Sequence, residues 1–568
     1  MWHHAHMTSY LKHTRRLCAQ GEPESAERWL LSLFAELPMP PPAEYGLALA
    51  ECNLALERVD RADACIQQVV LDHGDDVEAV LLALRCCRRR SEGSCLEQFR
   101  SRMLPFISCK AIALEWLQLL AENLDVEGSR AFSLVLLRQF PHDPDAQKAV
   151  AAIAWDLQSS PLLQQCELLL THPLWWARRL LIEKDFLSAE ATLRQAVEDP
   201  DSDSGLRLQC LQLFINEIKP DDALDLIQQH HSLFHGDSDW SWWFGRELLA
   251  RGQWSGGWAL YEYRYSSSSR SQILPPGFRL KSPQTLRLAI TLQNSQVVVY
   301  GEQGLGDTIM FASMMQDLCN EASAVYFVVQ PRLVQLMRAS LPQATVASSV
   351  SEDVLDAADI AASIGSIAQR YCGSGFQSAR PHSRLTPSVE ARSSIRRQLL
   401  DLPSGIKIGL AWRGGGTLQG LVRRSINLKS LLPMFEIDPI QWVNLQYQCK
   451  EHELKLADEL VGPRFHHFDC IDGELDEMAA LIKELDLVIT VQQTALHIAG
   501  SVDTPAWVMV PFSPEWRYGI SGRHMHWYDS VELFRQDIPG DWSAPIQQIS
   551  SRLRAFVAQR AGQNEPIS

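Results

Sequence analysis

Three small residues stand at equal intervals in the first half of the chain. Ala189, Ala223 and Gly257 are separated by intervals of 34 residues. Each is followed four residues later by a larger apolar residue, namely Leu193, Ile227 and Tyr261. Around them, apolar residues recur every three or four positions, which is the spacing of one helix face. A small residue at a fixed place in each copy lets two helices cross closely, so the pattern predicts repeated helix pairs.

A helix–turn–helix period of 34 residues is typical of tetratricopeptide repeats. We therefore predict an α-helical, tetratricopeptide-like repeat array over residues 1–270, with a non-repetitive helical domain as the alternative. Stacked repeats form a curved solenoid whose concave face usually binds protein. We expect this half of the chain to recruit a protein partner and to contribute little to binding a small ligand.

The pattern changes after a stretch rich in serine and proline at residues 266–293. From there, short apolar runs alternate with helical periods, which is typical of a parallel α/β fold. The predicted strands are residues 296–300, 325–329, 408–412, 442–445, 487–490 and 507–510, and the predicted helices include 308–318, 332–341 and 475–485. A segment rich in serine and proline at 373–390 predicts a hinge between two lobes, at residues 290–385 and 400–568.

The composition is that of a globular protein, with 46% hydrophobic residues, 21% charged residues and a net charge of −16. This charge disfavours binding to nucleic acid or to an anionic membrane, because neutralising phosphates needs a basic surface. No run of about 18 apolar residues is present, so we predict no membrane span. The 13 cysteines are irregularly spaced and predict reduced thiols, which indicates a cytoplasmic protein.

The segment 301–308 (GEQGLGDT) carries the clearest chemical signal. It joins a predicted strand to a predicted helix, and its glycines let backbone N–H groups approach a ligand. Gly301 and Gly306 have the spacing of a Walker A loop, but Asp307 stands where the phosphate-binding lysine is required. We therefore reject a nucleoside triphosphatase. Two interpretations of Asp307 stay open: a helix cap, or a general base facing an interlobe cleft.

Several segments resemble motifs of bacterial tetratricopeptide-repeat glycosyltransferase-like proteins, in the same order along the chain. They are residues 257–264 (GWALYEYR), 301–308 (GEQGLGDT), 409–414 (GLAWRG), 424–426 (RSI), 513–518 (SPEWRY), 533–536 (LFRQ) and 539–542 (PGDW). The catalytic region of that family is similar to the heptosyltransferases, which have the GT-B fold of two Rossmann-like lobes. The resemblance implies this fold for the C-terminal half.

The same resemblance implies roles for individual residues. Asp307 would be the catalytic base toward an acceptor hydroxyl. The C-terminal lobe would hold a nucleotide diphosphate at the loop 412–416, at Arg424 and at the turn before His497. The residues expected to bind donor or substrate are Gly304, Gly306, Arg413, Gly414, Arg424, Gln446, Gln493, Thr494, His497, Glu515 and Arg517.

Elementary chemistry supports part of this assignment. Arg413 follows an apolar strand and precedes three glycines, so its planar guanidinium can reach a diphosphate. An exposed basic patch formed with Arg423 and Arg424 is the alternative. The turn before His497 starts a helix after a strand, which is a natural anion site, whereas a lone histidine there more often packs the helix.

We therefore predict a metal-independent glycosyltransferase that uses a nucleotide-sugar donor and no cofactor, since no Asp-x-Asp metal motif occurs in the catalytic half. Its acceptor would be a protein recruited by the repeats. The alternative is a catalytically inactive adaptor or protein-binding scaffold with the same folds. Gln492 and Gln493 support this alternative, because heptosyltransferases usually have Asp-Thr in that turn.

Overall fold

The computed structural model describes residues 13–14, 16–18, 23–33, 43–55, 61–62, 64–66, 77–90, 103–123, 125–218, 223–230, 236–267, 278–288, 291–302, 304–373, 384–415 and 417–563. The chain divides into two compact units. The first comprises residues 1–192 with 416–422, and the second comprises residues 193–415 with 423–568. The three regions expected at 1–270, 290–385 and 400–568 stay predictions. Most of the expected hinge at 373–390 lies outside the described residues.

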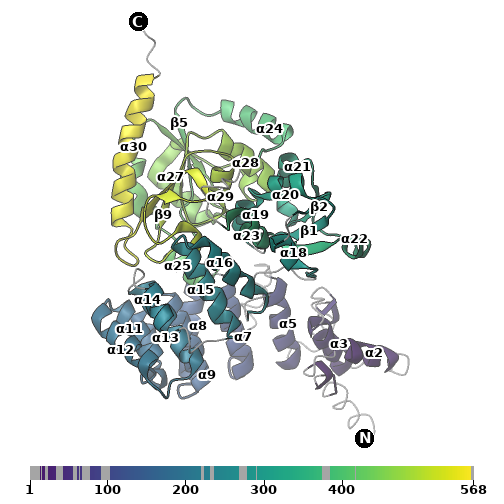
Figure 1. The fold of residues 1–568 in the computed structure, drawn as a ribbon. Coiled ribbons are helices and arrows are strands. Elements are labelled where there is room, and N and C mark those ends of the chain that lie inside the picture. The colour runs from purple at the N-terminus through teal and green to yellow at the C-terminus, as the bar shows by residue number, and fades with distance from the viewer. Residues whose placement is uncertain are drawn as a thin grey trace. The chain divides into compact units, whose positions relative to one another are not determined.

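The first unit is helical (Figure 1). Its helices are α2 (Pro23–Leu33), α3 (Ala43–Ala55), α5 (Val77–Arg90), α7 (Lys110–Glu122), α8 (Val126–Gln139), α9 (Pro144–Asp156), α10 (Ser160–Gln164) and α11 (Pro173–Ile182), and α12 (Phe186–Glu198) crosses into the second unit. Aspartates cap some of these helices: Asp125 accepts a hydrogen bond from the Gly128 N–H, and Asp143 accepts one from the Ala146 N–H. Such caps satisfy backbone N–H groups that have no partner inside the helix.

The helix pairs nearest the middle of the chain keep the 34-residue spacing. Helices α13 (Ser204–Glu217) and α15 (Ser238–Ala250) begin 34 residues apart, and α14 (Ala223–His230) and α16 (Trp254–Tyr261) complete their pairs. A Cβ on Gly257 would lie 2.7 Å from Cγ of Leu249, and one on Gly245 would lie 2.9 Å from Cβ of Leu260. Helices α15 and α16 therefore cross too closely for a larger residue, as the repeat predicts. Their identity as tetratricopeptide repeats stays a prediction.

The second unit contains two sheets. The first has four parallel strands in the order β3-β2-β1-β4: β1 (Gln296–Tyr300), β2 (Ala324–Val328), β3 (Thr345–Ala347) and β4 (Ile360–Ser363). The helices along it are α19 (Leu305–Ala312), α20 (Met315–Glu321), α21 (Val334–Ser340), α22 (Glu352–Ala357) and α23 (Ile367–Cys372). β1 is central because it is apolar on both faces: Val297 and Val299 join one core, whereas Val298 and Tyr300 join another.

The second sheet has seven strands in the order β10-β11-β9-β8-β5-β6-β7, and only the β10–β11 pair is antiparallel. The strands are β5 (Ile406–Leu410), β6 (Ile440–Asn444), β7 (Phe465–His466), β8 (Leu487–Val491), β9 (Ala506–Val510), β10 (His524–Met525) and β11 (Tyr528–Arg535). The principal helices are α24 (Val389–Leu400), α27 (Glu451–Val461), α28 (Leu475–Lys483), α29 (Thr494–Ser501) and α30 (Ser543–Gln563). A continuous core runs from β1 through α19 and α29 to β8 and β9.

All six predicted strands are present, with ends shifted by at most two residues. The short strands β3, β4, β7 and β10 and the longer strand β11 were not predicted. The helix predicted over 308–318 is instead two helices, α19 and α20. Ser313 causes the break, because its hydroxyl donates to the carbonyl of Met310 at 2.7 Å and competes with the helical bonds. The described part of the chain has no helix that is both long and apolar enough to cross a membrane.

A buried ionic network ties the last helix pair to the first sheet. Arg264, in the 3-10 turn that follows α16, is fully buried between the rings of Tyr261 and Tyr265. Its Nε lies 3.3 Å from Oε1 of Glu302, and its Nη1 donates to Oε1 of Glu262 at 2.6 Å. Burial raises the pKa of Glu302, and Arg264 opposes that rise. The motif at 257–264 therefore serves to dock the helices on the turn after β1.

Replacing Arg264 should destabilise the protein strongly, because Glu302 would keep a buried charge without its partner. We expect Arg264→Ala to lower the free energy of unfolding by about 3–5 kcal/mol. The matched control is Arg279→Ala, which breaks the exposed pair with Glu352 and should cost less than about 1 kcal/mol. Urea denaturation measures both, and equal losses for the two variants would contradict the structural role of Arg264.

Candidate functional site

Both sheets have a point where the strand order reverses. In the first sheet the chain leaves β1 toward β2 and returns on the other side as β4, and in the second it leaves β5 toward β6 and returns as β8. In parallel sheets, ligands bind at the carboxyl ends of the strands that flank such a point. The turn 301–308 follows β1, the loop 411–416 follows β5, and the turn 492–494 follows β8. Gly304, Gly306, Asp307, Arg413, Gly414, Gln493 and Thr494 lie in these three segments, whereas Gln446 follows β6, and Glu515 and Arg517 follow β9.

Asp307 lies in the first turn of α19, which begins at Leu305 with Gly304 as its N-cap. No side chain caps this helix, so the structure does not support the cap interpretation of Asp307. A Cβ on Gly304 would lie 2.5 Å from Oδ2 of Asp307. Gly304 thus makes room for the carboxylate. The other oxygen, Oδ1, accepts a hydrogen bond from Nη2 of Arg517.

Asp307 is one member of a charged cluster, which we define as Asp307, Arg517, Glu515, Arg424 and Arg246. Glu515 Oε2 lies 3.2 Å from Nη2 of Arg246, which comes from α15, and 3.9 Å from Nη1 of Arg517. Its other oxygen lies 3.9 Å from Nη1 of Arg424. Four segments that are far apart in sequence therefore meet at one place.

The cluster favours the ionised forms of its members. Burial alone would raise the pKa of Glu515, but Arg246, Arg517 and Arg424 outweigh it, and the pKa is lowered. Burial would lower the pKa of Arg517, but Asp307 and Glu515 raise it. With three guanidinium groups and two carboxylates, the charged cluster has a net charge of one positive unit. Such an excess attracts an anion, above all one with oxygens that arginine can bind in pairs.

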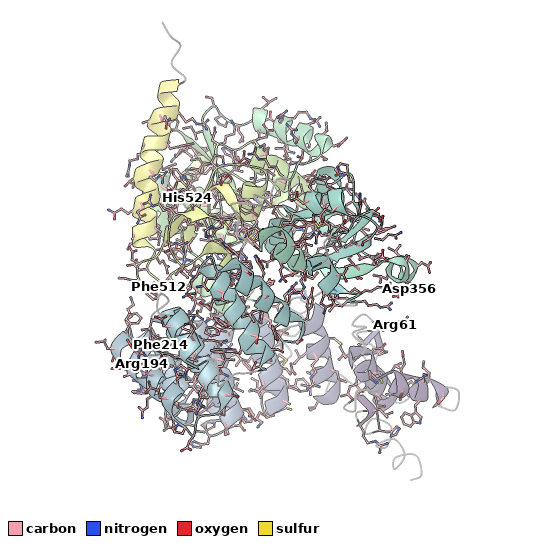
Figure 2. The ribbon with its side chains drawn as sticks, in the orientation of Figure 1. Arg61, Arg194, Phe214, Asp356, Phe512 and His524 are labelled. Atoms are coloured by element: carbon pink, nitrogen blue, oxygen red, sulfur yellow. The ribbon has the colours of Figure 1, made fainter. Side chains whose placement is uncertain are left out.

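The loop that carries Glu515 is fixed by Gln536, which follows β11. Oε1 of Gln536 accepts hydrogen bonds from the N–H of Phe512 and from the N–H of Gly540, each at 3.1 Å. Phe512, labelled in Figure 2, starts the loop from β9 toward the charged cluster. Gln536, in the segment 533–536, therefore holds the start of this loop, and Gly540, in the segment 539–542, holds the Gln536 side chain in place.

Arg413 does not join the charged cluster. Its Nη2 lies 3.1 Å from Oε2 of Glu453 and donates to the carbonyl of Gln448 at 2.7 Å. Gln446 accepts from the N–H groups of Trp412 and Arg413 at 3.2 and 2.8 Å, so it shapes the loop after β5. In the same loop, the N–H of Gly414 donates to the hydroxyl of Ser425 at 3.1 Å.

The turn after β8 presents the N-terminus of α29, with Gln493 as N-cap and Thr494 as first residue. No side chain caps it, and Gln493 instead donates to the hydroxyl of Thr490 at 3.2 Å. Gln492 is buried, and neither its amide nitrogen nor its amide oxygen has a hydrogen-bond partner. A buried amide without partners is costly, so this turn is suited to a polar ligand.

Gly306 and His497 pack against each other. A Cβ on Gly306 would lie 2.8 Å from Cδ2 of His497, so the glycine permits the close approach of α19 to α29. His497 is buried, with its ring nitrogens 3.4 Å from the hydroxyls of Tyr528 and Tyr518. Burial and then the charge of Arg517 lower its pKa to about 3. These contacts match the packing alternative for His497.

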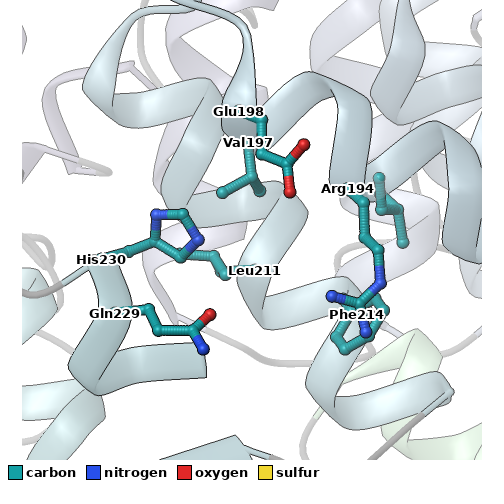
Figure 3. A pocket seen from close by; sticks show the side chains of 8 residues that line it. Arg194, Val197, Glu198, Leu211, Phe214, Gln229 and His230 are labelled. Atoms are coloured by element: carbon teal, nitrogen blue, oxygen red, sulfur yellow. The ribbon is translucent and has the colours of Figure 1, made fainter. Parts of the chain in front are cut away.

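A separate pocket lies among α12, α13 and α14 (Figure 3). Its lining combines apolar and polar side chains: Leu193, Arg194, Val197, Glu198, Leu211, Phe214, Gln229 and His230. The guanidinium of Arg194 lies 4.7 Å from the centre of the Phe214 ring. The pocket belongs to the helical part of the second unit and contains none of the catalytic or binding residues predicted from the sequence.

Sequence reasoning missed Arg246 and Glu453. Arg246 stands in a helix whose apolar pattern gave no sign that one arginine would reach Glu515, 269 residues later. Glu453 lies in the first turn of α27, where an acidic residue is ordinary, and its pairing with Arg413 depends on the neighbouring strands β5 and β6. Only a contact between distant segments identifies either residue.

The buried His497 predicts a dependence of stability on pH. The unfolded chain takes up a proton below the ordinary pKa of 6.5, whereas the folded protein resists it down to about 3. Stability should therefore fall as the pH drops from 6.5 toward 3, by about 1.4 kcal/mol per pH unit from this group. His497→Gln should remove this contribution to the pH dependence of the free energy of unfolding. His524→Gln, at an exposed histidine, should leave that pH dependence unchanged. Urea unfolding between pH 4 and 7 measures it, and an unchanged slope in His497→Gln would refute the effect.

No protein-family model matches this chain. It is 29% identical over 333 residues to Protein FlbA of Caulobacter vibrioides, an alignment that covers 55% of this chain and 54% of FlbA. The chain thus spans about half the length of this curated relative.

Three solved glycosyltransferases are similar in part. The Escherichia coli ADP-heptose LPS heptosyltransferase II is 14% identical with a TM-score of 0.35, covering 47% of this chain and 99% of that chain. A glycosyl transferase family 9 protein of Veillonella parvula is 13% identical with a TM-score of 0.34, covering 49% and 97%. A mutant O-GlcNAc transferase of Thermobaculum terrenum is 10% identical with a TM-score of 0.25, covering 80% and 95%.

Proposed function

We propose that this chain is a metal-independent glycosyltransferase with a GT-B fold, which transfers a sugar from a nucleotide-sugar donor to an acceptor hydroxyl. The observation that carries the proposal is the charged cluster. It combines a carboxylate from the turn after β1 with arginines beside the loops after β5 and β9. A sugar transfer needs both groups, a base for the acceptor and positive charge for the departing diphosphate.

In this mechanism Asp307 accepts the proton of the acceptor hydroxyl as its oxygen bonds to the anomeric carbon. The bond from that carbon to the diphosphate oxygen breaks, and the electron pair leaves with the diphosphate. Arg424 and the uncapped N-terminus of α29 stabilise the negative charge that develops. The charge comes from arginine and backbone dipoles, so the transfer requires no metal.

Arg517 links the base to the donor site, because in the absence of a ligand its guanidinium donates a hydrogen bond to Asp307. A bound diphosphate competes for Arg517, since the diphosphate as a whole carries more negative charge than one carboxylate and attracts the guanidinium more strongly. Donor binding would then free the Asp307 oxygen that Arg517 occupies, so that this oxygen can accept a proton from the acceptor hydroxyl.

The helical array supplies the acceptor in this proposal, as a protein held on its surface. The competing proposal is an inactive adaptor, and two observations favour it. Gln492 and Gln493 occupy the turn before α29, and Arg413 binds Glu453 rather than facing the charged cluster. An adaptor would retain nucleotide binding or protein binding without turnover.

Asp307→Asn tests the catalytic role. The substitution keeps the shape of the side chain and removes its charge, so the protein should fold and bind donor while transfer falls by about 10²–10⁴-fold. The assay would follow donor turnover over a panel of nucleotide sugars in EDTA, which also tests metal independence. Asp353→Asn, at an exposed first-turn aspartate of α22, is the control and should retain wild-type activity. Wild-type turnover by a folded Asp307→Asn protein would exclude Asp307 as the base. If neither the wild-type protein nor the variant turns over any donor, the adaptor is favoured.

Arg424→Ala tests the diphosphate site. Loss of a hydrogen bond to a charged group should weaken the affinity for ADP, GDP or UDP by about 1.5–3 kcal/mol, which is roughly 10- to 150-fold. Arg413→Ala carries the same prediction, with an added loss of stability because Glu453 would lose its partner. The exposed Arg396→Ala should bind normally. Calorimetry in which the Arg424 and Arg413 variants both keep wild-type affinity would locate the diphosphate elsewhere.

A further inference from the structure

Tyr447 is an exposed aromatic residue at the edge of the second sheet. It is 37% exposed, a fraction similar to those of Trp176 and Tyr263 in the helical parts of the chain. Of these three aromatic residues, Tyr447 is the one that follows a strand, because β6 ends three residues before it and pairs with β5. Ligands bind at the carboxyl ends of parallel strands next to a switch point. The Tyr447 ring therefore lies where a ligand can reach it.

The turn that carries Tyr447 is held in an unusual backbone conformation. The next residue, Gln448, has a φ of +48°, in the left-handed region that residues other than glycine rarely adopt. Its N–H donates to Oδ1 of Asp472 at 2.7 Å, and its carbonyl accepts from Nη2 of Arg413 at 2.7 Å. Two charged side chains therefore hold the strained residue on both of its sides. Such strain persists only where surrounding contacts impose it, and it is common at ligand-binding sites.

Arg413 links this turn to the charged cluster. Besides the carbonyl of Gln448, its Nη2 contacts the carbonyl of Tyr447 at 3.5 Å, so the guanidinium supports the turn directly. Two residues later in the same loop, the carbonyl of Gly415 accepts from Arg424 of the charged cluster at 2.6 Å. Two residues of chain span at most about 7 Å. The turn and the charged cluster are therefore anchored to one short loop, so that one extended ligand can contact both.

A guanidinium from the first sheet's side covers the Tyr447 ring. Arg332, in the 3-10 turn Pro331–Leu333 after β2, has its Cζ 4.4 Å from the centre of that ring. Its Nε donates to the carbonyl of Gly473 at 2.8 Å, next to the Asp472 that holds the turn. Guanidinium planes stack on aromatic faces, as flat ligand rings also do. Arg332 therefore occupies a face of Tyr447 on which a flat ligand would otherwise stack.

We propose that Tyr447 is a stacking platform for the nucleobase of the donor, and that Arg332 covers this platform until a nucleotide binds. The base displaces the guanidinium and stacks on the tyrosine ring, while the diphosphate reaches the charged cluster. Stacking on an aromatic side chain accepts any base, because every base has a π-face. The platform therefore accepts purine and pyrimidine nucleotides alike. The nucleotide itself comes from the function proposed above, on which this inference rests.

The test compares nucleotides with inorganic pyrophosphate, which has the phosphates but no base. Calorimetry of the full-length protein with ADP, GDP, UDP and pyrophosphate gives, for each variant, the ratio of nucleotide affinity to pyrophosphate affinity. Tyr447→Ala should lower this ratio by about 5- to 150-fold, the loss typical of one stacked base. Tyr447→Phe keeps the ring and should stay within about twofold of the wild type. Tyr263→Ala, at a similarly exposed tyrosine, is the matched control and should leave the ratio unchanged.

Arg332→Ala should change the same ratio in the opposite direction. Removing the guanidinium that competes with the base should raise the ratio by about 2- to 5-fold, the range of an exposed cation–π contact. The loss of one positive charge weakens the binding of nucleotides and of pyrophosphate, so it largely cancels in the ratio. Arg396→Ala, at an exposed arginine of α24, is the control and should leave the ratio unchanged. A ratio that falls or stays constant in Arg332→Ala would overturn the covering role of Arg332.

Arg413 is a positioning residue in this proposal, because it acts on the base through the turn that it supports. Arg413→Ala should therefore weaken the binding of nucleotides more than the binding of pyrophosphate, and so lower the ratio. An equal loss for both kinds of ligand would assign Arg413 to the diphosphate and overturn its role in positioning Tyr447.

Two outcomes would overturn the platform itself: an unchanged ratio in a folded Tyr447→Ala protein, or a wild-type protein that binds none of the three nucleotides. Donor turnover decides the transferase separately. Nucleotide binding that depends on Tyr447, in a protein without turnover, would support the platform and refute the transferase. Turnover in which Tyr447→Ala keeps the wild-type KM for the donor would support the transferase and refute the platform.

Discussion

The buried pair of Arg264 and Glu302 is the constraint on which the charged cluster depends. Glu302 belongs to the turn after β1, and its carboxylate also accepts bonds from Ser363 and Gly365 after β4. One side chain therefore joins the two strand ends that flank the switch point of the first sheet. Arg264 supplies the charge that makes this burial tolerable. Because the turn is fixed, α19 starts at a defined place, and Asp307 is presented toward Arg517.

The arrangement of the charged cluster follows from the same principle of compensated charge. Glu515 could not stay ionised where it lies without Arg246, Arg424 and Arg517 around it. These arginines in turn leave one positive charge beyond what the two carboxylates neutralise. The helix pair α15 and α16 thus contributes two arginines to the α/β region. Arg264, just after α16, pairs with Glu302 in the turn after β1, and Arg246, in α15, pairs with Glu515 in the charged cluster. It is a structural part of the candidate site as well as of the array.

Local sequence patterns predicted most of the longer strands and the turn with Asp307. Which side chains meet at the candidate site depends on contacts between distant segments, which local patterns do not show. The strands β1, β2, β5, β6, β8 and β9 were predictable, because each is an apolar run between turns. β3 and β4 are three and four residues long, which is too short for a periodic signal. The turn with Asp307 was predictable from its glycines, and Gly304 indeed clears space for the carboxylate. The pairing of Arg413 with Glu453 was not, because it depends on which loops the sheet brings together.

The loop after β5 shows how one sequence can be interpreted in two ways. Three glycines after Arg413 predicted close approach of a phosphate, and the structure shows two of them closing the base of the loop: the N–H of Gly414 donates to the hydroxyl of Ser425, and the carbonyl of Gly415 accepts from Arg424. The sequence also predicted that the array would contribute little to ligand binding. That expectation stays a prediction, and it did not foresee that helix α25 (Leu418–Arg423), inside this loop, places Leu418 and Val422 against the core formed by α7 to α11. A helix of six residues needs a partner to exist, and the partner found is the array. The next residue, Arg424, is positioned locally instead, because its guanidinium donates to the carbonyl of Gly415 at 2.6 Å and lies 3.9 Å from Glu515.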